Sequence, residues 1–290
     1  MKKVIFKGSG VAVITPMHSD LSVNYEEYGK ILDFLLDNGS DAIISCGTTG
    51  EASTLGDKEH IDVIDYAVKH VNGRIPVIAG TGSNDTGYAI ELTKEAERVG
   101  ADATLQVTPY YNKTSQKGLI AHFTAIAEAT TLPVIIYNVP SRTGLSVAPE
   151  TYKELSANKN IVATKEASGN LSMIASLISL CGDELAVYSG NDQEITPIMA
   201  LGGKGVISVL ANVKPKETAD ICRLCLENDF NSAAELQISM IPLINALFSD
   251  VNPIPVKHAM SLIGFDAGPC RLPLYELSDN NKALLSQLLG

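Results

Sequence analysis

Short apolar runs alternate with amphipathic segments along most of the chain. The runs recur at intervals of roughly 20 to 35 residues, which is typical of a series of βα units. Eight of them are predicted to be strands, at positions 11–15, 42–46, 76–80, 103–108, 133–137, 161–165, 185–189 and 205–210. Eight consecutive units predict an α/β fold in which the strands close into a (β/α)8 TIM barrel.

The segments between the strands have the pattern of helices, for example 25–37, 58–71, 88–99 and 118–129. Several are followed by glycine, which is common just after the last residue of a helix. The strands are almost continuously apolar, as expected of parallel strands covered on both faces. A doubly wound open sheet is the alternative, but no G-x-G-x-x-G follows the first strand and no Walker sequence occurs.

The alternation of strands and helices ends after the eighth unit. The segments 232–248, 255–263 and 281–289 are predicted to be helices, with no strand among them. We therefore expect a barrel that carries the active site over 1–228 and a C-terminal helical domain over 229–290.

The charge composition of the chain argues against some classes of binding partner. The chain has 290 residues, with 33 acidic and 22 basic side chains and a formal net charge of −11. A surface of that sign repels phosphate backbones and anionic lipid headgroups, so we expect neither nucleic acid nor a membrane surface as a partner. No apolar stretch has the length of a bilayer span or of a signal-peptide core, which predicts a cytoplasmic protein.

The five cysteines are expected to be free thiols, because they are too few and too dispersed for a disulfide framework. Cys222 and Cys225 form a C-x-x-C, but within a helical pattern and without the second pair that a zinc site needs. We interpret them as two small helix residues.

In a barrel of this kind, catalytic groups come from the carboxyl ends of the strands. The sixth run ends in Lys165, and the two-residue period of a strand places this side chain on the same face as Ile161 and Ala163. The same rule groups Tyr137 with Ile135 on the fifth run. Because neighbouring strands lie about 5 Å apart, Lys165 and Tyr137 are predicted to meet in the mouth of the barrel.

A lysine among apolar walls is more readily neutral, because burial disfavours the ammonium form. The neutral amine can attack a ketone, and the resulting iminium turns the neighbouring carbon into an enamine nucleophile. A phenol within reach can move the proton, and Tyr137 is the candidate. In an arbitrary protein, a lysine at the end of a strand more often has its ammonium group in water and its methylene chain on apolar surface. Here the face that Lys165 shares with Tyr137 favours catalysis.

The sequence lacks the motifs of metal-dependent enzymes and of serine hydrolases. The five histidines show no HxH or HExxH pairing and none ends a predicted strand, so no metal site is expected. No G-x-S-x-G occurs, which argues against a serine hydrolase. Each histidine is predicted to be a surface or helix-packing residue.

Six motifs follow one another at consistent spacing: GTTGE at 47–51, TPYYN at 108–112, YNVPSRTG at 137–144, KEAS at 165–168, SGND at 189–192 and NPIPVK at 252–257. Together they resemble the dihydrodipicolinate synthase family, also called 4-hydroxy-tetrahydrodipicolinate synthases. This family belongs to the pyruvate-dependent Schiff-base aldolases of the N-acetylneuraminate lyase superfamily. The resemblance implies a lyase that condenses pyruvate with L-aspartate-4-semialdehyde in diaminopimelate and lysine biosynthesis.

The resemblance also implies roles for single residues. Lys165 matches the Schiff-base lysine, and Tyr137 matches the phenol that shuttles protons. Thr48 and Tyr111 match the relay that connects this phenol to solvent. In the family the tyrosine after the fourth strand reaches into the neighbouring subunit's site, so Tyr111 implies an obligate homodimer, which commonly pairs into a homotetramer.

Thr49 resembles the residue that binds the pyruvate carboxylate. Arg142 resembles the arginine that holds the semialdehyde carboxylate, a task that suits a planar guanidinium. Gly190 and Ile207 correspond to positions whose backbone lines the same pocket. The implied chemistry needs no cofactor, because pyruvate itself becomes an imine on Lys165.

Two alternatives remain. Relatives in the superfamily cleave N-acetylneuraminate or 2-keto-3-deoxy sugar acids with the same lysine and tyrosine, but Arg142 favours a short anionic substrate over a polyhydroxylated one. A non-catalytic paralogue that only binds a keto acid would be expected to lose Lys165, Tyr137 or Arg142, and all three are present.

The lysine-binding site of feedback-inhibited members resembles a set here that includes His60, Asn84 and Tyr110. Asp57 and Tyr88 stand where those members carry a histidine and a glutamate. Loss of the glutamate removes an acceptor for the ammonium group of the ligand. We therefore expect weak or absent inhibition by lysine.

Overall fold

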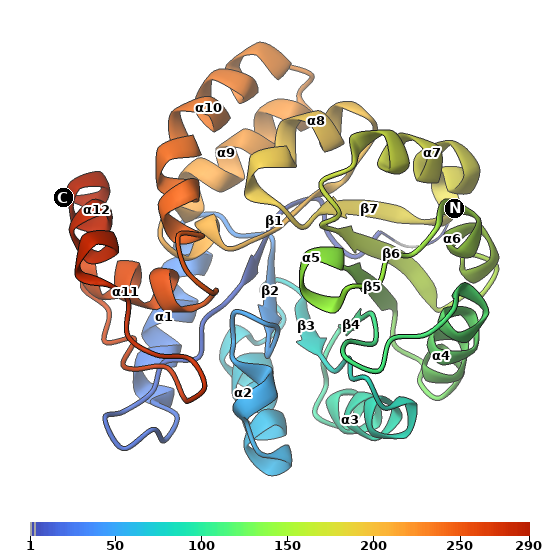
Figure 1. Ribbon diagram of the computed structural model, residues 1–290, viewed down its shortest axis with the longest axis horizontal. Helices are drawn as coiled ribbons and strands as arrows, with labels where there is room; N and C mark the ends of the chain where they lie inside the picture. The colour runs from blue at the N-terminus through green and yellow to red at the C-terminus, as the bar shows by residue number, and fades with distance from the viewer. Residues whose placement is uncertain (1, 3) are drawn as a thin grey trace.

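The computed structural model describes residue 2 and residues 4–290. Eight parallel strands form one closed barrel in chain order, and β8 pairs back onto β1 (Figure 1). They are β1 (Gly8–Ala12), β2 (Ala42–Ser45), β3 (Val77–Gly80), β4 (Ala103–Val107), β5 (Val134–Asn138), β6 (Ile161–Glu166), β7 (Ala186–Ser189) and β8 (Gly205–Ser208). The barrel confirms the predicted fold class and excludes the open sheet.

Helices follow the strands and surround the barrel (Figure 1). They are α1 (Tyr25–Asp37), α2 (Asp57–Val71), α3 (Thr86–Arg98), α4 (Gln116–Glu128), α5 (Pro140–Thr143), α6 (Pro149–Leu155), α7 (Leu171–Cys181), α8 (Ile195–Ala200) and α9 (Pro215–Leu226). Single turns of 3-10 helix are η1 (Ala52–Thr54), η2 (Gly182–Glu184), η3 (Asp192–Glu194) and η4 (Leu210–Asn212). The glycines expected after helices have positive φ, for example 83° at Gly39 and 72° at Gly73, which a residue without Cβ adopts freely.

The first strand begins earlier than the predicted run 11–15. It pairs with β8 from Gly8 onward. After Ala12 the chain leaves the sheet and bonds to loops, with Ile14 N donating to a side chain of η4 at 3.2 Å and the Thr15 hydroxyl to a backbone carbonyl after β2 at 2.8 Å. Hydropathy does not separate the two parts of the run, because both are buried.

The alternation of side chains along the strands divides the core in two. On β2, Ile44 belongs to the cluster inside the barrel, whereas Ile43 packs outward under the helices. Phe6, from the segment before β1, stacks on Tyr188 within the barrel, with ring centroids 4.3 Å apart. The interior is therefore packed, and open space remains at one end of the barrel.

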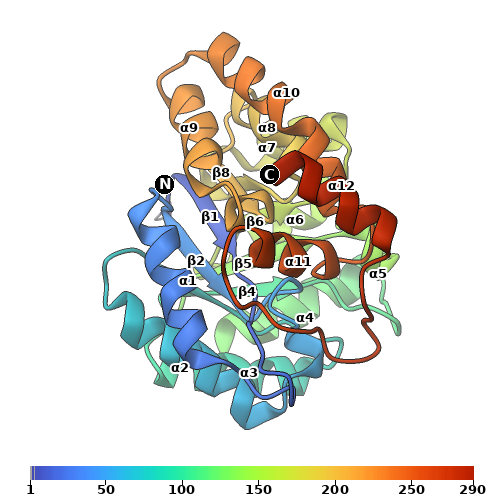
Figure 2. The same cartoon turned by 90° about the vertical axis from the view of Figure 1, so that its left-hand side faces the viewer.

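The C-terminal helices are α10 (Phe230–Leu247), α11 (Ile254–Leu262) and α12 (Asp279–Leu289), which gather on one side of the barrel (Figure 2). They confirm the predicted helical appendage. Gln237 of α10 joins it to the barrel, since its Nε2 donates to Gln193 O at 2.6 Å and its Oε1 accepts from Thr196 N at 2.8 Å. The boundary near residue 228 stays a prediction.

All five cysteines are free, and Cys222 and Cys225 are buried in α9 as interpreted. Within the described part of the chain, none of the helices has both the length and the apolar character needed to cross a membrane.

Candidate active site

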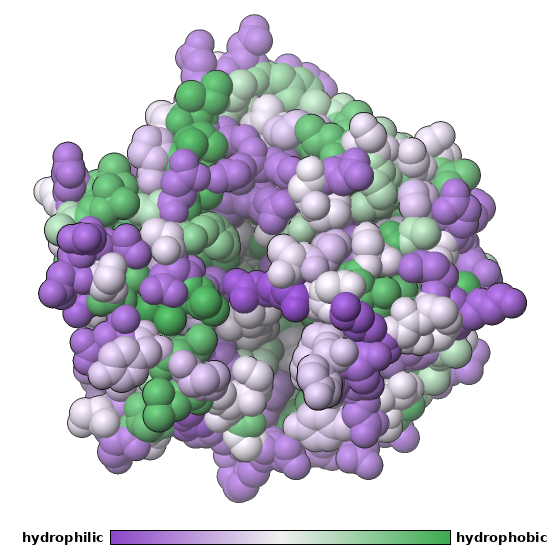
Figure 3. Space-filling view, in the orientation of Figure 1, coloured by the Kyte–Doolittle hydropathy of each residue, from purple (hydrophilic) through white to green (hydrophobic). Residues whose placement is uncertain are grey.

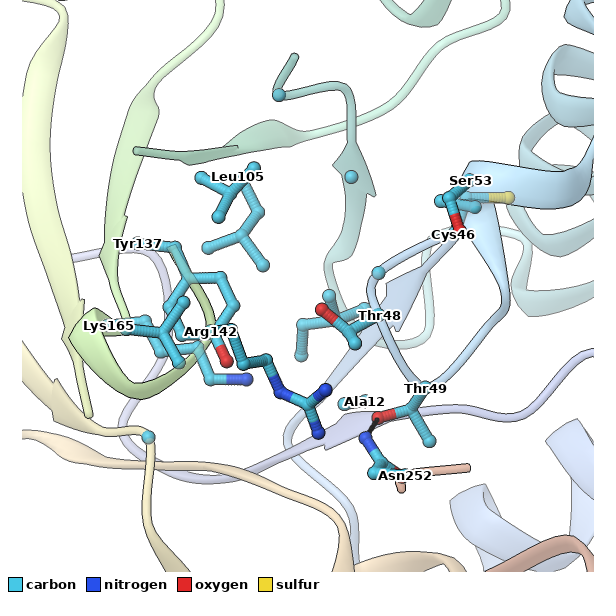
Figure 4. A pocket seen from close by; sticks show the side chains of 18 of the residues that line it. Ala12, Cys46, Thr48, Thr49, Ser53, Leu105, Tyr137, Arg142, Lys165 and Asn252 are labelled. Carbon is cyan, nitrogen blue, oxygen red and sulfur yellow. Dashed lines mark hydrogen bonds between the residues drawn. The ribbon is translucent and has the colours of Figure 1, made fainter. Parts of the chain in front are cut away.

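A cavity of about 610 Å³ opens at the carboxyl ends of the strands. Figure 3 shows the recess near the middle of this face, and Figure 4 shows side chains that line it. The cavity brings together most of the predicted site residues, namely Thr48, Thr49, Tyr137, Arg142, Lys165 and Gly190, with His60 and Tyr110 of the expected lysine site.

Lys165 and Tyr137 meet in the cavity as their strands predict. They are register partners on β6 and β5, and both side chains face the barrel interior. The Lys165 Nζ lies 4.3 Å from the centroid of the Tyr137 ring (Figure 4). Their exposed fractions are only 6% and 8%, so water scarcely solvates the amine or the phenol.

The surroundings of Lys165 shift the pKa of its amine. Burial lowers its pKa from 10.5 to about 8, the carboxylate of Asp192 opposes this change, and the positive charge of Arg142 adds to it. At pH 7 a pKa of 8 leaves about one molecule in ten with a neutral amine, some 300-fold more than an ordinary lysine. The site therefore supplies a nucleophile near neutral pH.

The phenol of Tyr137 stays protonated. Burial raises its pKa to about 12, the charge of Arg142 lowers it and that of Glu166 raises it. A protonated hydroxyl beside a neutral amine can donate a proton to an oxygen that forms on a carbonyl carbon, and recover it later.

Asp192, at the start of η3, is a buried carboxylate whose charge acts on Lys165. Its Oδ2 accepts from Val209 N at 3.1 Å and Leu210 N at 2.9 Å. Burial raises the pKa of this carboxyl. A hydrogen bond from the Ser208 side chain, those from the Leu210 and Val209 N–H groups and the charge of Lys165 oppose that effect.

The loop after β2 supplies two threonines to the cavity. Thr48 is exposed at its rim, whereas Thr49 is buried and its Oγ1 accepts from Asn252 Nδ2 at 2.9 Å (Figure 4). The loop ends at Glu51, whose buried carboxylate accepts from Lys257 Nζ of α11 at 2.8 Å.

Arg142 lies on α5, the single turn that follows β5. Pro140 begins this turn, and Gly144 ends it with a φ of 65°. The buried Thr143 anchors the turn by accepting a hydrogen bond from the Thr108 hydroxyl at 3.1 Å. Figure 4 shows the Arg142 side chain extending across the cavity toward Thr49.

Gly190 lies against the stem of Lys165. A Cβ at this position would be 2.7 Å from Ala167 Cβ and 3.1 Å from Lys165 Cγ, so a larger residue would displace the lysine. Ile207 of β8, the other position expected from its backbone, is fully buried in the barrel interior and does not line the cavity.

Tyr111 does not enter the cavity of its own chain. Its side chain is 92% exposed, and its φ of 68° turns the chain sharply after β4. The preceding Tyr110 lines the cavity instead. An aromatic side chain so exposed beside a cavity is available to another molecule.

The residues that resemble the lysine-binding site of feedback-inhibited members lie in and beside the cavity. His60 is buried, with Nε2 2.8 Å from Gly80 O, and burial lowers its pKa. Asn84 donates to Tyr110 O at 3.1 Å. The hydroxyl of Tyr88 donates to Asp57 Oδ1 at 2.7 Å.

Sequence reasoning assigned no role to Asn252, Asp192, Glu51 or Lys257. The motifs that contain them were visible, but their partners lie in other parts of the chain. Asn252 is 203 positions from Thr49, and Lys257 is 206 positions from Glu51. A buried lysine paired with a buried glutamate is visible only after folding.

Among the described residues, no group of three or more His, Cys, Asp or Glu side chains is arranged to hold a metal ion.

A closed (β/α)8 barrel with a buried, pKa-lowered lysine beside a phenol at its catalytic end defines a lyase of the Schiff-base aldolase type. Residues 5–290 match the model of the Dihydrodipicolinate synthetase family. The chain belongs to this family.

Three similar proteins show how close the likeness is. The 4-hydroxy-tetrahydrodipicolinate synthase of Caldicellulosiruptor bescii is 54% identical over 285 residues, which cover 98% of this chain and 96% of that protein. The crystal structure of dihydrodipicolinate synthase from Aquifex aeolicus is 46% identical with a TM-score of 0.96, covering 98% and 97% of the two chains. A dihydrodipicolinate synthase from Acinetobacter baumannii, solved in complex with pyruvate, is 44% identical with a TM-score of 0.96, covering 99% and 98%.

Proposed function

We propose that Lys165 captures pyruvate as a Schiff base and that the enzyme condenses it with L-aspartate-4-semialdehyde, giving 4-hydroxy-tetrahydrodipicolinate for diaminopimelate and lysine biosynthesis. The observation that carries the proposal is the lysine itself, buried beside the Tyr137 ring with a pKa lowered to about 8. The name of the Caldicellulosiruptor bescii relative and the pyruvate in the Acinetobacter baumannii structure support it.

The neutral Nζ of Lys165 attacks C2 of pyruvate, and Tyr137 donates a proton to the oxygen that develops there. Loss of water leaves the iminium, and loss of a C3 proton gives the enamine. The enamine carbon adds to the aldehyde of the semialdehyde. The amino group of that substrate then displaces Lys165 from C2, which closes the ring and regenerates the free amine, so one water is released overall.

Two carboxylates need binding groups. We assign Thr49, buried at the base of the β2 loop, to the carboxylate of pyruvate. We assign Arg142 to the carboxylate of the semialdehyde, since a guanidinium offers two parallel donors to a carboxylate. The backbone of Gly190, against the lysine stem, lines the pyruvate end of the cavity.

The proposed proton relay also needs a residue from a second subunit. Thr48 lines the rim of the cavity, whereas Tyr111 projects away from the chain. We propose that Tyr111 reaches the site of a second subunit in a homodimer, and that the relay runs from Tyr137 through Thr48 to this tyrosine. We also propose that the dimers pair into a tetramer.

A biosynthetic enzyme of this kind would act in the cytoplasm.

The sugar-acid aldolase alternative is less well supported. A polyhydroxylated substrate needs neutral hydrogen-bonding groups where this cavity presents the Arg142 cation. A non-catalytic keto-acid binder would have no need of a lysine with a lowered pKa.

The test is chemical trapping. The protein is incubated with pyruvate and reduced with borohydride, and the mass increase is mapped. We expect one adduct, on Lys165, and none in the Lys165→Arg variant. No adduct, or an adduct on Lys204 or Lys257, would refute the mechanism. Turnover of aspartate semialdehyde against 2-keto-3-deoxy sugar acids then separates the synthase from its alternative.

A further inference from the structure

The Thr49 hydroxyl is held from the other end of the chain. Asn252, between α10 and α11, donates from Nδ2 to Thr49 Oγ1 over 2.9 Å. Both side chains line the cavity, and their exposed fractions are 5% and 2% (Figure 4). The contact therefore lies inside the substrate site and is shielded from water.

This bond has a direction. An amide nitrogen only donates, so Thr49 Oγ1 is the acceptor in its contact with Asn252. A threonine hydroxyl has a single hydrogen, which must then point to a different acceptor. The hydroxyl is thereby left to donate to a ligand in the cavity that it lines, the polarity that a carboxylate requires.

The backbone around Thr49 is held as well. At the end of the same loop, Glu51 accepts from Lys257 Nζ at 2.8 Å and from Arg271 N at 2.9 Å. Gly50 O accepts from the Thr15 hydroxyl at 2.8 Å. With the loop fixed next to Thr49, Asn252 needs only to set the direction of one hydroxyl.

We propose that Asn252 is a positioning residue that fixes the Thr49 hydroxyl as a hydrogen-bond donor to the substrate carboxylate. It acts through Thr49 and so controls affinity for the keto acid more than the chemical step. This inference rests on the proposed function, in which that carboxylate belongs to pyruvate. It gives the C-terminal segment a part in substrate recognition through Thr49.

The decisive variant is Asn252→Asp, which keeps the size of the side chain. A carboxylate at this position accepts the Thr49 hydrogen, reversing the bond, and also repels the substrate anion. We expect KM for pyruvate to rise about ten-fold or more, with a much smaller change in kcat, because a charge-assisted hydrogen bond is lost in ground state and transition state alike. Asn280→Asp, at an exposed asparagine of α12, is the matched control and should change neither constant.

A double-mutant cycle tests the route through Thr49. Asn252→Ala, Thr49→Val and the double variant are compared by the pyruvate concentration that gives half-maximal borohydride trapping. We expect each single change to weaken binding and Asn252→Ala to cost nothing further once Thr49 is valine.

Two results would overturn the inference: a KM for pyruvate in Asn252→Asp within two-fold of the unmodified enzyme, or an Asn252→Ala effect that persists in full beside Thr49→Val. Failure of the proposed function looks different, because the unmodified enzyme would then form no adduct on Lys165 at all.

Discussion

Lys165 and Tyr137 face each other across two adjacent strands, with the amine 4.3 Å from the centroid of the phenol ring. This arrangement removes water from the amine and leaves a proton donor within its reach. Burial is the largest cause of the lowered pKa of Lys165, and the same burial keeps Tyr137 protonated. One packing relationship thus suits both residues to their proposed roles, Lys165 as the nucleophile and Tyr137 as the acid.

The first prediction is the pH dependence of Schiff-base formation. Only neutral Lys165 attacks, so with a pKa of about 8 the rate should rise about ten-fold per pH unit below that value and level off above it. Stopped-flow or quenched trapping with saturating pyruvate gives the profile. A rate that is flat through this range, or that keeps rising toward pH 10, would contradict it.

The second prediction concerns Asp192, whose carboxylate raises the pKa of Lys165 against the effect of burial. Asn at this position keeps an oxygen for the N–H groups of Val209 and Leu210 but removes the charge. The pKa of Lys165 should then fall, and the rising limb of the trapping profile should move to lower pH by about half a unit or more. The iminium, a buried cation, should also form less completely.

The control for this variant is Asp41→Asn. Asp41 is partly buried and, like Asp192, accepts a backbone hydrogen bond, from Ser9 N at 2.8 Å, but it lies at the amino end of β2. The Asp41→Asn variant should leave the rising limb of the trapping profile at the same pH. Equal shifts in both variants would mean that the effect on Lys165 is not local.

Much of this site was predictable because it depends on local periodicity. The eight apolar runs identified the barrel, and the two-residue period of a strand brought Lys165 and Tyr137 to one face. The first strand was placed too late because the buried exit segment after Ala12 has the same hydropathy as the strand.

The rest depends on contacts between distant segments. The Asn252–Thr49 and Lys257–Glu51 contacts join the appended helices to the β2 loop, and each becomes visible only when the chain is folded. The environment of Asp192 is set by backbone N–H groups, which no side-chain pattern reveals. The role proposed for Tyr111, which is 92% exposed in one chain, requires a second copy of the chain.

The third prediction tests the shared site. Tyr111→Phe should lower kcat by about 10²-fold, since a proton relay loses its hydroxyl. Lys165→Ala should be inactive. Mixing the two variants under conditions that exchange subunits should restore activity, because one site of each mixed dimer then combines an intact Lys165 with an intact Tyr111 from the other chain. Mixtures that show only the sum of the separate activities would place Tyr111 in its own chain's site or outside catalysis.

The fourth prediction concerns lysine. Asp57 already accepts a hydrogen bond from Tyr88, whose pKa is raised to about 12 by burial and by this carboxylate, so the phenol stays protonated and bonded to Asp57 near pH 7. We expect lysine to inhibit weakly or not at all in a coupled assay. A low-micromolar inhibition constant would disprove this. Tyr88→Glu combined with Asp57→His should strengthen inhibition, because it supplies the missing acceptor.

The last prediction concerns the ion pair between Lys257 and Glu51, whose side chains are 2% and 0% exposed. Lys257→Met leaves the Glu51 carboxylate buried without its cation, so the free energy of unfolding should fall by about 3–5 kcal/mol. The double variant Lys257→Met with Glu51→Gln removes that uncompensated charge and should recover much of the loss, since the amide oxygen of the introduced glutamine can still accept from Arg271 N.

Urea unfolding followed by circular dichroism measures both variants. Lys58→Met serves as the control, because Lys58 pairs with Asp62 at the surface, where its side chain is 89% exposed and the pair contributes little. A single variant as stable as the unmodified protein, or a double variant no better than the single one, would mean that the buried charges do not depend on each other. If they do depend on each other, this ion pair helps to hold α11 against the β2 loop, and Lys257→Met should also raise KM for pyruvate in the fraction that remains folded.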